Sequence, residues 1–262
     1  MDYLSICAIV KDENAYLPEW IEYHKLVGVE RFYIYDNGSR VPLAQTLARD
    51  VAEGRAVVIP FPGRARQCEA YMNCALHAGM KTTWLAFIDV DEFICPKETD
   101  DLRILFRTFE GFGGVGLNWQ MFGPSGLKER PPGLQIEHFT MKGPVQFEWN
   151  THIKTVAKPP LMTGYPNCHF ASYRPGTLCV NEKGMPFSGA FSRPVHVDRV
   201  QLNHYTTRSL GEFQDKIKRM CADGTGKDMT FFHKVEKECS SIRDESILRF
   251  VPRLREAMLK RA

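Results

Sequence analysis

The first 120 residues alternate between short apolar runs and amphipathic stretches, and this alternation constrains the fold more than any other feature. The apolar runs have the length of strands and lack a polar face, as strands buried on both sides do. They lie at residues 4–10, 31–35, 57–59, 84–88 and 115–119. Between them, apolar residues recur at helical spacing, at residues 16–27, 43–51, 64–78 and 102–109. This pattern predicts an α/β fold: a mostly parallel sheet with helices on both faces.

The remainder of the chain differs in composition and shows less regular periodicity. Residues 123–194 are dense in proline and glycine, which predicts a loop-rich region folded onto the sheet. Ser209 and Glu212 have the spacing of a capping box and predict the start of a helix. We therefore expect a single domain over residues 1–262.

Composition excludes several classes of protein. The net charge of +3 over 262 residues is small, whereas a dedicated nucleic-acid-binding protein presents a strongly basic face, so we expect no nucleic-acid partner. The eight cysteines form no CxxC pair and no zinc-ligand spacing, which favours reduced thiols. No apolar run reaches the roughly 18 residues of a membrane-spanning helix, and no basic signal segment opens the chain. These features predict a cytoplasmic protein.

Residues 249–261 combine an apolar face with five basic residues and one acid. One interpretation is peripheral contact with the inner face of a membrane, because basic amphipathic helices bind anionic lipid. The other is an ordinary closing helix with cations near its C-terminus. We favour the closing helix, because Pro252 would interrupt the amphipathic one.

The central chemical feature is the pair Asp89 and Asp91 at the carboxyl end of the strand expected at residues 84–88. Side chains alternate along an extended segment, so both carboxylates are expected on the same side. Ligands of open α/β sheets bind at such strand ends. Two converging carboxylates favour a bound Mg²⁺ or Mn²⁺, which stabilises the negative charge on a departing diphosphate. The alternative is an acidic loop exposed to solvent.

Polar residues follow two other expected strands. Asp12 and Glu13 come after the first strand, and Asp36 and Asn37 come after the second. Because parallel strands end at one edge of a sheet, these side chains are expected to line the same edge as Asp89. The alternatives are a helix cap for Asp12 and a plain turn for Asn37.

Seven blocks of sequence resemble glycosyltransferase family 92 and the related family 2-like enzymes. They occur in the family's order, from residue 5 to about residue 220. The blocks are CAIVKDE (7–13), LPEWIEYH (17–24), FYIYDNGS (32–39), RQ (66–67), WLAFIDVDEF (84–93), WQMFG (119–123) and NHYTTRS (203–209).

The resemblance implies a GT-A fold, a nucleoside-diphosphate sugar donor (UDP-galactose in the better-known members) and inversion at the anomeric carbon. Residues 1–120 would bind the nucleotide sugar, and residues 121–262 would form the acceptor side. The donor-binding residues it implies are Asp12, Glu13, Asp36, Asn37, Arg66, Gln67 and Asp89. The metal ligands it implies are Asp89, Asp91 and His204, with Mn²⁺ or Mg²⁺ as the ion.

Two further roles concern the acceptor, which is expected to be a glycan or a lipid-linked sugar. An inverting transfer needs a general base; the resemblance favours Glu137, with Glu129 and His152 as alternatives, beside Asp91 as the other catalytic residue. Trp119 is expected to stack on a sugar, although a core tryptophan is an equal alternative. The family's Gly-His after the Phe-Gly block is Gly126-Leu127 here, a departure that bears on acceptor identity.

Two other functions compete with this interpretation. A sugar nucleotidyltransferase also binds a metal and a diphosphate, but it carries a glycine-rich basic loop after its first strand. Residues 11–15 of this chain are acidic and contain no glycine, which disfavours that activity. A non-catalytic nucleotide-sugar or carbohydrate-binding protein of the same fold is the second alternative, and product formation would distinguish it.

Overall fold

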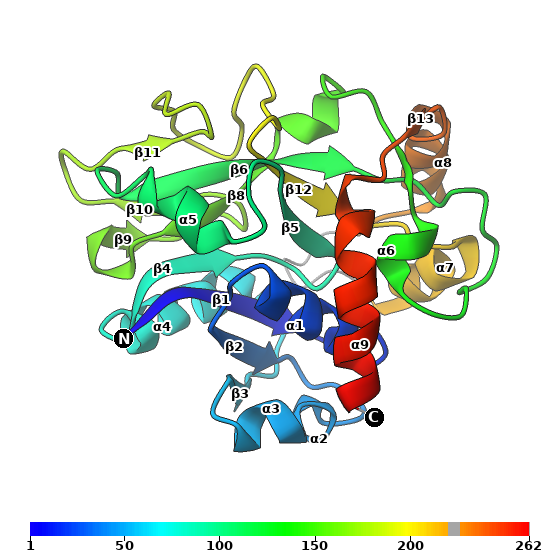
Figure 1. The fold of residues 1–262 in the computed structure, drawn as a ribbon, viewed down its shortest axis with the longest axis horizontal. Helices are drawn as coiled ribbons and strands as arrows, with labels where there is room; N and C mark the ends of the chain where they lie inside the picture. The colour runs from blue at the N-terminus through cyan, green and yellow to red at the C-terminus, as the bar shows by residue number, and fades with distance from the viewer. Residues whose placement is uncertain (220–225, 262) are drawn as a thin grey trace.

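The computed structural model describes residues 1–219 and 226–261, and it has α/β architecture as predicted (Figure 1). A nine-stranded sheet in the order β3-β2-β1-β4-β8-β6-β12-β5, with β11 beside β6, crosses this described part. Its strands are β1 (Asp2–Val10), β2 (Arg31–Asp36), β3 (Ala56–Pro60), β4 (Thr82–Phe87), β5 (Glu92–Pro96), β6 (Gly114–Met121), β8 (Ile153–Ala157), β11 (Cys179–Val180) and β12 (Val200–His204). The first four strands of that order are parallel, whereas β8 runs antiparallel to both of its neighbours.

The helices and the shorter elements complete the described residues. The helices are α1 (Leu17–Leu26), α2 (Leu43–Thr46), α3 (Ala48–Ala52), α4 (Gln67–Ala78), α5 (Leu102–Arg107), α6 (Gln135–His138), α7 (Leu210–Arg219), α8 (Met229–Glu238) and α9 (Val251–Arg261). Two short strand pairs lie outside the sheet: β7 (Met141–Lys142) with β13 (Ile242–Arg243), and β9 (Met162–Gly164) with β10 (Ser172–Tyr173). Three 3₁₀ turns are η1 (Glu148–Thr151), η2 (Pro159–Leu161) and η3 (Ser246–Phe250).

The alternation of side chains along β1 explains why helices cover both faces of the sheet. Ile6 and Ala8 pack into one core with Trp20 of α1, whereas Cys7 and Ile9 pack into a second core with residues of α4. Because successive side chains of a strand point to opposite faces, the apolar residues 6–10 of β1 require an apolar partner on each side. Figure 1 shows α9 lying beside α1 on the first of these faces.

The second half contributes more regular structure than its composition predicts. The segment 153–157 was expected to be loop-rich, but it forms β8, which is buried throughout and lies between β4 and β6. Its pairing is entirely non-local, with partners about 40 and 70 residues away, so local periodicity gives little sign of it. β12 from the second half likewise pairs with β5 from the first.

The C-terminal helix is not interrupted by its proline. Helix α9 begins at Val251, so Pro252 lies in the first turn, where its missing N–H removes no helical hydrogen bond. The basic side chains of this segment pair with carboxylates of the protein: Arg249 and Arg253 with Asp100, Arg255 with Glu137, Lys260 with Glu256, and Arg261 with Glu22 and Asp50. These pairs favour the closing-helix interpretation. None of the described helices combines the length and apolar composition needed to cross a membrane.

A buried carboxylate, that of Glu19, joins the first half of the chain to the second. Glu19 of α1 accepts hydrogen bonds from the backbone N–H groups of Gln135 and Ile136, at 2.7 and 3.1 Å, where α6 begins. The side chain is 4% exposed. Burial raises the pKa of Glu19 to about 7, against the opposing effect of these N–H groups and of Arg208.

The raised pKa of Glu19 predicts a specific pH dependence of stability. The folded pKa of about 7 lies above the ordinary value of 4.5, so the folded state binds the extra proton between these values. The contribution of Glu19 to the unfolding free energy is therefore fully present below pH 4.5 and is lost as the pH rises through 7. We expect wild type to lose about 2 kcal/mol relative to Glu19→Gln between pH 5 and pH 7.5 in urea titrations. A difference that stays constant over this range would contradict the assignment.

Candidate functional site

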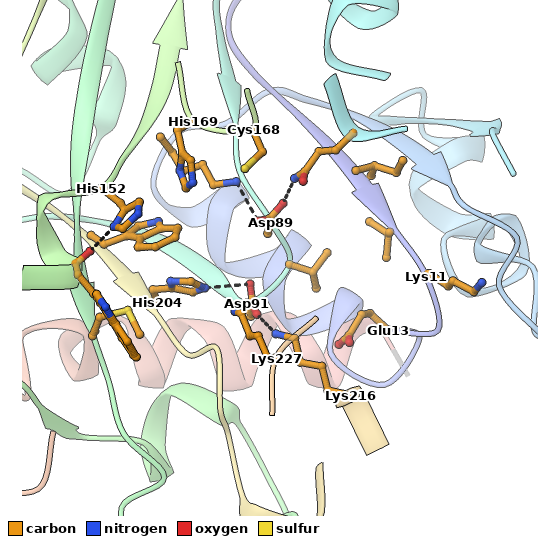
Figure 2. A pocket seen from close by; sticks show the side chains of 18 of the residues that line it. Lys11, Glu13, Asp89, Asp91, His152, Cys168, His169, His204, Lys216 and Lys227 are labelled. Atoms are coloured by element: carbon orange, nitrogen blue, oxygen red, sulfur yellow. Dashed lines mark hydrogen bonds and ion pairs between the residues drawn. The ribbon is translucent and has the colours of Figure 1, made fainter. Parts of the chain in front are cut away.

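A cavity of about 460 Å³ opens at the carboxyl edge of the parallel strands (Figure 2). Its wall is built from the ends of β1 and β4, from β6, β8 and β12, and from α7 and the start of α8. The charged and titratable residues that line it are Lys11, Glu13, Asp89, Asp91, His152, Lys154, Cys168, His169, His204, Lys216 and Lys227. Four lysines thus face a cavity with three carboxylates, which suits a negatively charged ligand.

The segment that carries the two aspartates is a tight turn, not the extended segment expected. The N–H of Glu92 donates to the carbonyl of Asp89 at 3.0 Å, and the N–H of Asp89 donates to the Glu92 carboxylate at 2.8 Å. Asp89 and Asp91 both line the cavity, as predicted, but the turn sends their carboxylates to different partners. The two aspartates therefore reach the cavity through this turn, and the expectation that they alternate along an extended strand was wrong.

Asp89 is engaged by three donors. Its Oδ1 accepts from Gln67 Nε2 at 2.7 Å and from the Tyr71 hydroxyl at 3.2 Å, so helix α4 fixes one side of the carboxylate. Its Oδ2 accepts from Lys154 Nζ at 2.8 Å. The Asp89 carboxylate is therefore fixed in the cavity wall from both sides.

The register of the sheet places Lys154 beside Asp89. Ala86 of β4 pairs with Val156 of antiparallel β8, so two residues further along, Lys154 is level with Ile88 and adjacent to Asp89. The Lys154 side chain is 1% exposed, and its Nζ lies 3.8 Å from the buried Glu92 carboxylate. Although burial opposes the charge, Asp89 and Glu92 hold the pKa of Lys154 well above its usual value.

The register of β12 brings His204 to Asp91. His204 pairs with Glu92 across antiparallel β5, and its Nε2 lies 3.7 Å from Asp91 Oδ1. Asp91 Oδ2 accepts from Lys216 Nζ of α7 at 2.5 Å. Burial lowers the pKa of His204 well below its usual value and keeps the ring neutral. Despite its own burial, Asp91 has its pKa held well below the usual value by the charges of Lys216 and Arg208.

Imidazole rings surround Trp119, which lines the cavity. Its ring centroid lies 4.2 Å from that of His204, 4.9 Å from that of His152 and 5.1 Å from that of His169. Its indole N–H donates to Glu92 Oε1 at 2.6 Å. The indole therefore packs among histidines instead of presenting a bare face, and a stacking role toward an acceptor stays a prediction.

Four residues expected at the site line neither this cavity nor the adjoining cavity described below. Asp36 accepts from the N–H groups of Ser39 and Leu43 and so closes its own loop. Asn37 donates to two backbone carbonyls, those of Phe61 and Gly63. The contacts of Asn37 fit the plain turn given as its alternative.

The other two residues outside the cavity are Arg66 and Glu137. Arg66 pairs with Glu69 one turn along α4 and lies over the Phe61 ring. Glu137 pairs with Arg255 of α9 at 2.5 Å. The structure thus does not bring Glu137 to the reacting centre, because α6 presents it to the closing helix instead.

Asp12 and Glu13 line an adjoining second cavity of about 680 Å³, and Glu13 lines the main cavity as well. Glu13 is paired with Arg208 at 2.5 Å, and the Asp12 carboxylate accepts from the backbone N–H of Arg40 at 2.8 Å. Lys216 also borders both cavities. Of the residues predicted for the site, the main cavity therefore brings together Glu13, Gln67, Asp89, Asp91, Trp119 and His204.

Sequence reasoning missed the cations of the cavity. Lys154 lies in a strand that was not expected, and Lys216 is one of several charged residues on α7. Helical spacing from the capping box would have placed Lys216 on the same side as Phe213, near the site. The predicted box itself is present in altered form, because both the N–H and the hydroxyl of Ser209 donate to Glu212.

The fold and the cavity together define an α/β protein whose charged ligand site lies at the carboxyl ends of parallel strands. Residues 3–245 match the model of glycosyltransferase family 92. The chain belongs to glycosyltransferase family 92.

Relatives in plants carry the same family name. A family 92 protein of Oryza sativa subsp. japonica is 30% identical over 132 residues, which cover 49% of this chain and 23% of that protein. One of Arabidopsis thaliana is 27% identical over 172 residues, which cover 61% of this chain and 29% of that protein. The chain thus aligns with less than a third of the length of these relatives.

Solved structures match the fold in part. The crystal structure of S. aureus TarS 1–349 in complex with UDP is 10% identical, with a TM-score of 0.42, and the match covers 61% of this chain and 47% of that one. A mycobacterial protein is 18% identical, with a TM-score of 0.34, and the match covers 62% of this chain and 55% of that one.

The buried position of Lys154 predicts a large stability effect. Lys154→Met removes the only cation that Asp89 and Glu92 share in the described structure, leaving the fully buried Glu92 carboxyl without an ionic partner. We expect a loss of about 3 kcal/mol in unfolding free energy. The control Lys260→Met breaks an exposed pair with Glu256 and should leave stability almost unchanged, because solvent screens such a pair. Equal effects of the two variants in urea titrations would refute the structural role of Lys154.

Proposed function

We propose that this protein is a metal-dependent glycosyltransferase that moves a sugar from a UDP-sugar to a glycan or lipid-linked acceptor. The observation that carries the proposal is the convergence of Asp91, His204 and Lys216 at one cavity, in a chain that belongs to a glycosyltransferase family. The cavity volume of about 460 Å³ lies in the range of sites for small molecules and cofactors.

Asp91 and His204 have the chemistry to hold the metal. Asp91 Oδ1 and His204 Nε2 are 3.7 Å apart, so both can reach one ion at roughly 2.1 Å. Among the described residues, no three His, Cys, Asp or Glu side chains are arranged so that they could hold a metal ion. Donor phosphates and water would therefore complete the coordination shell, as Mg²⁺ sites in proteins commonly require. A bound Mn²⁺ or Mg²⁺ would neutralise charge developing on the diphosphate.

The lysines would supply the remaining positive charge. Lys216 is 26% exposed, and within residues 1–219 and 226–261 its ammonium is held by Asp91 and one backbone carbonyl, so it can turn from the carboxylate to a phosphate oxygen. Lys154 is fixed by Asp89 and Glu92 and acts through them, because it keeps the Asp89–Asp91 turn in place.

Inversion of configuration is the stereochemical outcome we propose. A retaining double displacement needs a carboxylate that attacks the anomeric carbon. The three carboxylates lining the main cavity are each paired with a cation: Glu13 with Arg208, Asp89 with Lys154, and Asp91 with Lys216. We therefore propose that none of them is the attacking nucleophile.

UDP-galactose is the donor to examine first, because the family resemblance implies it. A cytoplasmic location remains part of this proposal.

Binding of nucleotide tests the donor site directly. A panel of UDP and GDP with and without Mn²⁺ should give one metal-dependent thermal shift, with UDP. At a ligand concentration of 100 times Kd, the expected shift is about 5–10 °C. Asp91→Asn should abolish the metal dependence, because it removes the anionic ligand.

The matched control for this experiment is Glu137→Gln. Its carboxylate is paired with Arg255 outside the cavity, so nucleotide binding should equal that of wild type. No shift with any nucleotide would overturn the donor site. A shift that is lost in Glu137→Gln and kept in Asp91→Asn would move the site to another part of the molecule.

A further inference from the structure

A transfer to a hydroxyl group needs a proton acceptor, and the carboxylates of the main cavity are poorly suited to the task. Each is paired with a cation: Glu13 with Arg208, Asp89 with Lys154, and Asp91 with Lys216. A carboxylate whose oxygens are directed at a paired cation is poorly placed to accept a proton from an acceptor hydroxyl. The imidazoles therefore remain as candidates among the described residues that line the cavity.

The tautomer of His152 is set by its backbone partner. Its Nδ1 lies 3.0 Å from the carbonyl oxygen of Trp149. A carbonyl oxygen only accepts, so Nδ1 carries the proton and the neutral ring bears its lone pair on Nε2. The ring stacks on Trp119 with an interplanar angle of 25°, which fixes its plane at the wall of the cavity (Figure 2).

We propose that His152 is the general base of the transfer. In this step the acceptor oxygen forms a bond to the anomeric carbon of the donor sugar while the bond from that carbon to the diphosphate breaks. The acceptor hydroxyl proton passes to Nε2 of His152, and the nucleoside diphosphate leaves with the bonding electron pair. This inference rests on the proposed glycosyltransferase function. It assigns to His152 the role of general base that was expected of Glu137, which is paired with Arg255 instead.

The surroundings of His152 keep it in the form that can accept a proton. Burial lowers its pKa, and the neighbouring charges of Arg193, Lys227 and Lys154 lower it further, against the hydrogen bond to Trp149. The aromatic groups packed against the ring are Trp119, His169 and Phe191. The acidic limb of the pH profile, where the base becomes protonated, is therefore expected below the ordinary histidine value of 6.5.

Two other histidines offer internal comparisons. His169 also donates through Nδ1, to the carbonyl of Ile153 at 3.0 Å, and its ring centroid is 5.0 Å from that of His152. It is thus the natural rival as a base. His204 faces Asp91 with Nε2 and is assigned to the metal, so it is not a candidate.

The experiment uses the purified chain, UDP-galactose and other UDP-hexoses, Mn²⁺ and water as the acceptor, with UDP release as the readout. His152→Ala should lower kcat by about 10²- to 10⁴-fold while the UDP- and Mn²⁺-dependent thermal shift stays that of wild type. Added imidazole should restore part of the rate in His152→Ala and none in His169→Ala. A purely structural role for His152 would not give this rescue.

Three results would overturn the proposal: an unchanged kcat in His152→Ala, rescue of His169→Ala alone, or the opposite tautomer. The last is read without turnover, from ¹⁵N NMR of histidine-labelled protein at pH 7, where Nε2 of His152 should be unprotonated. If wild type neither binds UDP nor releases it from any donor, the proposed function fails. The tautomer measurement then still decides whether His152 is poised as a base.

Discussion

The buried ammonium of Lys154 is the interaction on which the site depends. It lies between Asp89 and Glu92 with a side chain that is 1% exposed. Glu92 in turn accepts from the Asp89 N–H and from the Trp119 indole. One lysine therefore holds together the turn after β4, the end of β6 and the middle of β8. Burying the Lys154 ammonium costs solvation free energy, and a buried charge is stable only when it is paired and hydrogen-bonded.

A consequence is that the cavity has a fixed part and a movable part. Asp89 is held by Lys154 and by two donors of α4, so it cannot reorganise easily. Asp91 is held by Lys216, which is partly exposed and lies on α7. A donor diphosphate and its metal ion would then compete only with Lys216. Positive charge would be supplied without displacing the buried pair, and preorganised charge of this kind is what transition states of group transfer require.

Local patterns predicted the first half of the fold and the position of the two aspartates. The apolar run of β1 and the helical spacing of α1 are both visible without the structure, and the end of β4 places Asp89 at the ligand edge. Non-local pairing explains most of what was missed. Lys154 reaches Asp89 through the register of β8, and nothing near residue 154 in the chain indicates that register. The family resemblance implied a donor role for Asp36, and its strand-end position placed it at the ligand edge. The same position allows a carboxylate to close its own loop, and the structure shows that it does.

The central claim is that a nucleoside diphosphate and a metal ion occupy the main cavity together. A crystal structure of the protein with UDP and Mn²⁺ tests this most directly. The account predicts an anomalous Mn²⁺ peak within about 2.3 Å of an Asp91 carboxylate oxygen and of His204 Nε2, with the diphosphate on the same ion and Lys216 turned from Asp91 to a phosphate oxygen. Nucleotide bound in the second cavity beside Asp12, or Mn²⁺ bound away from Asp91, would contradict it.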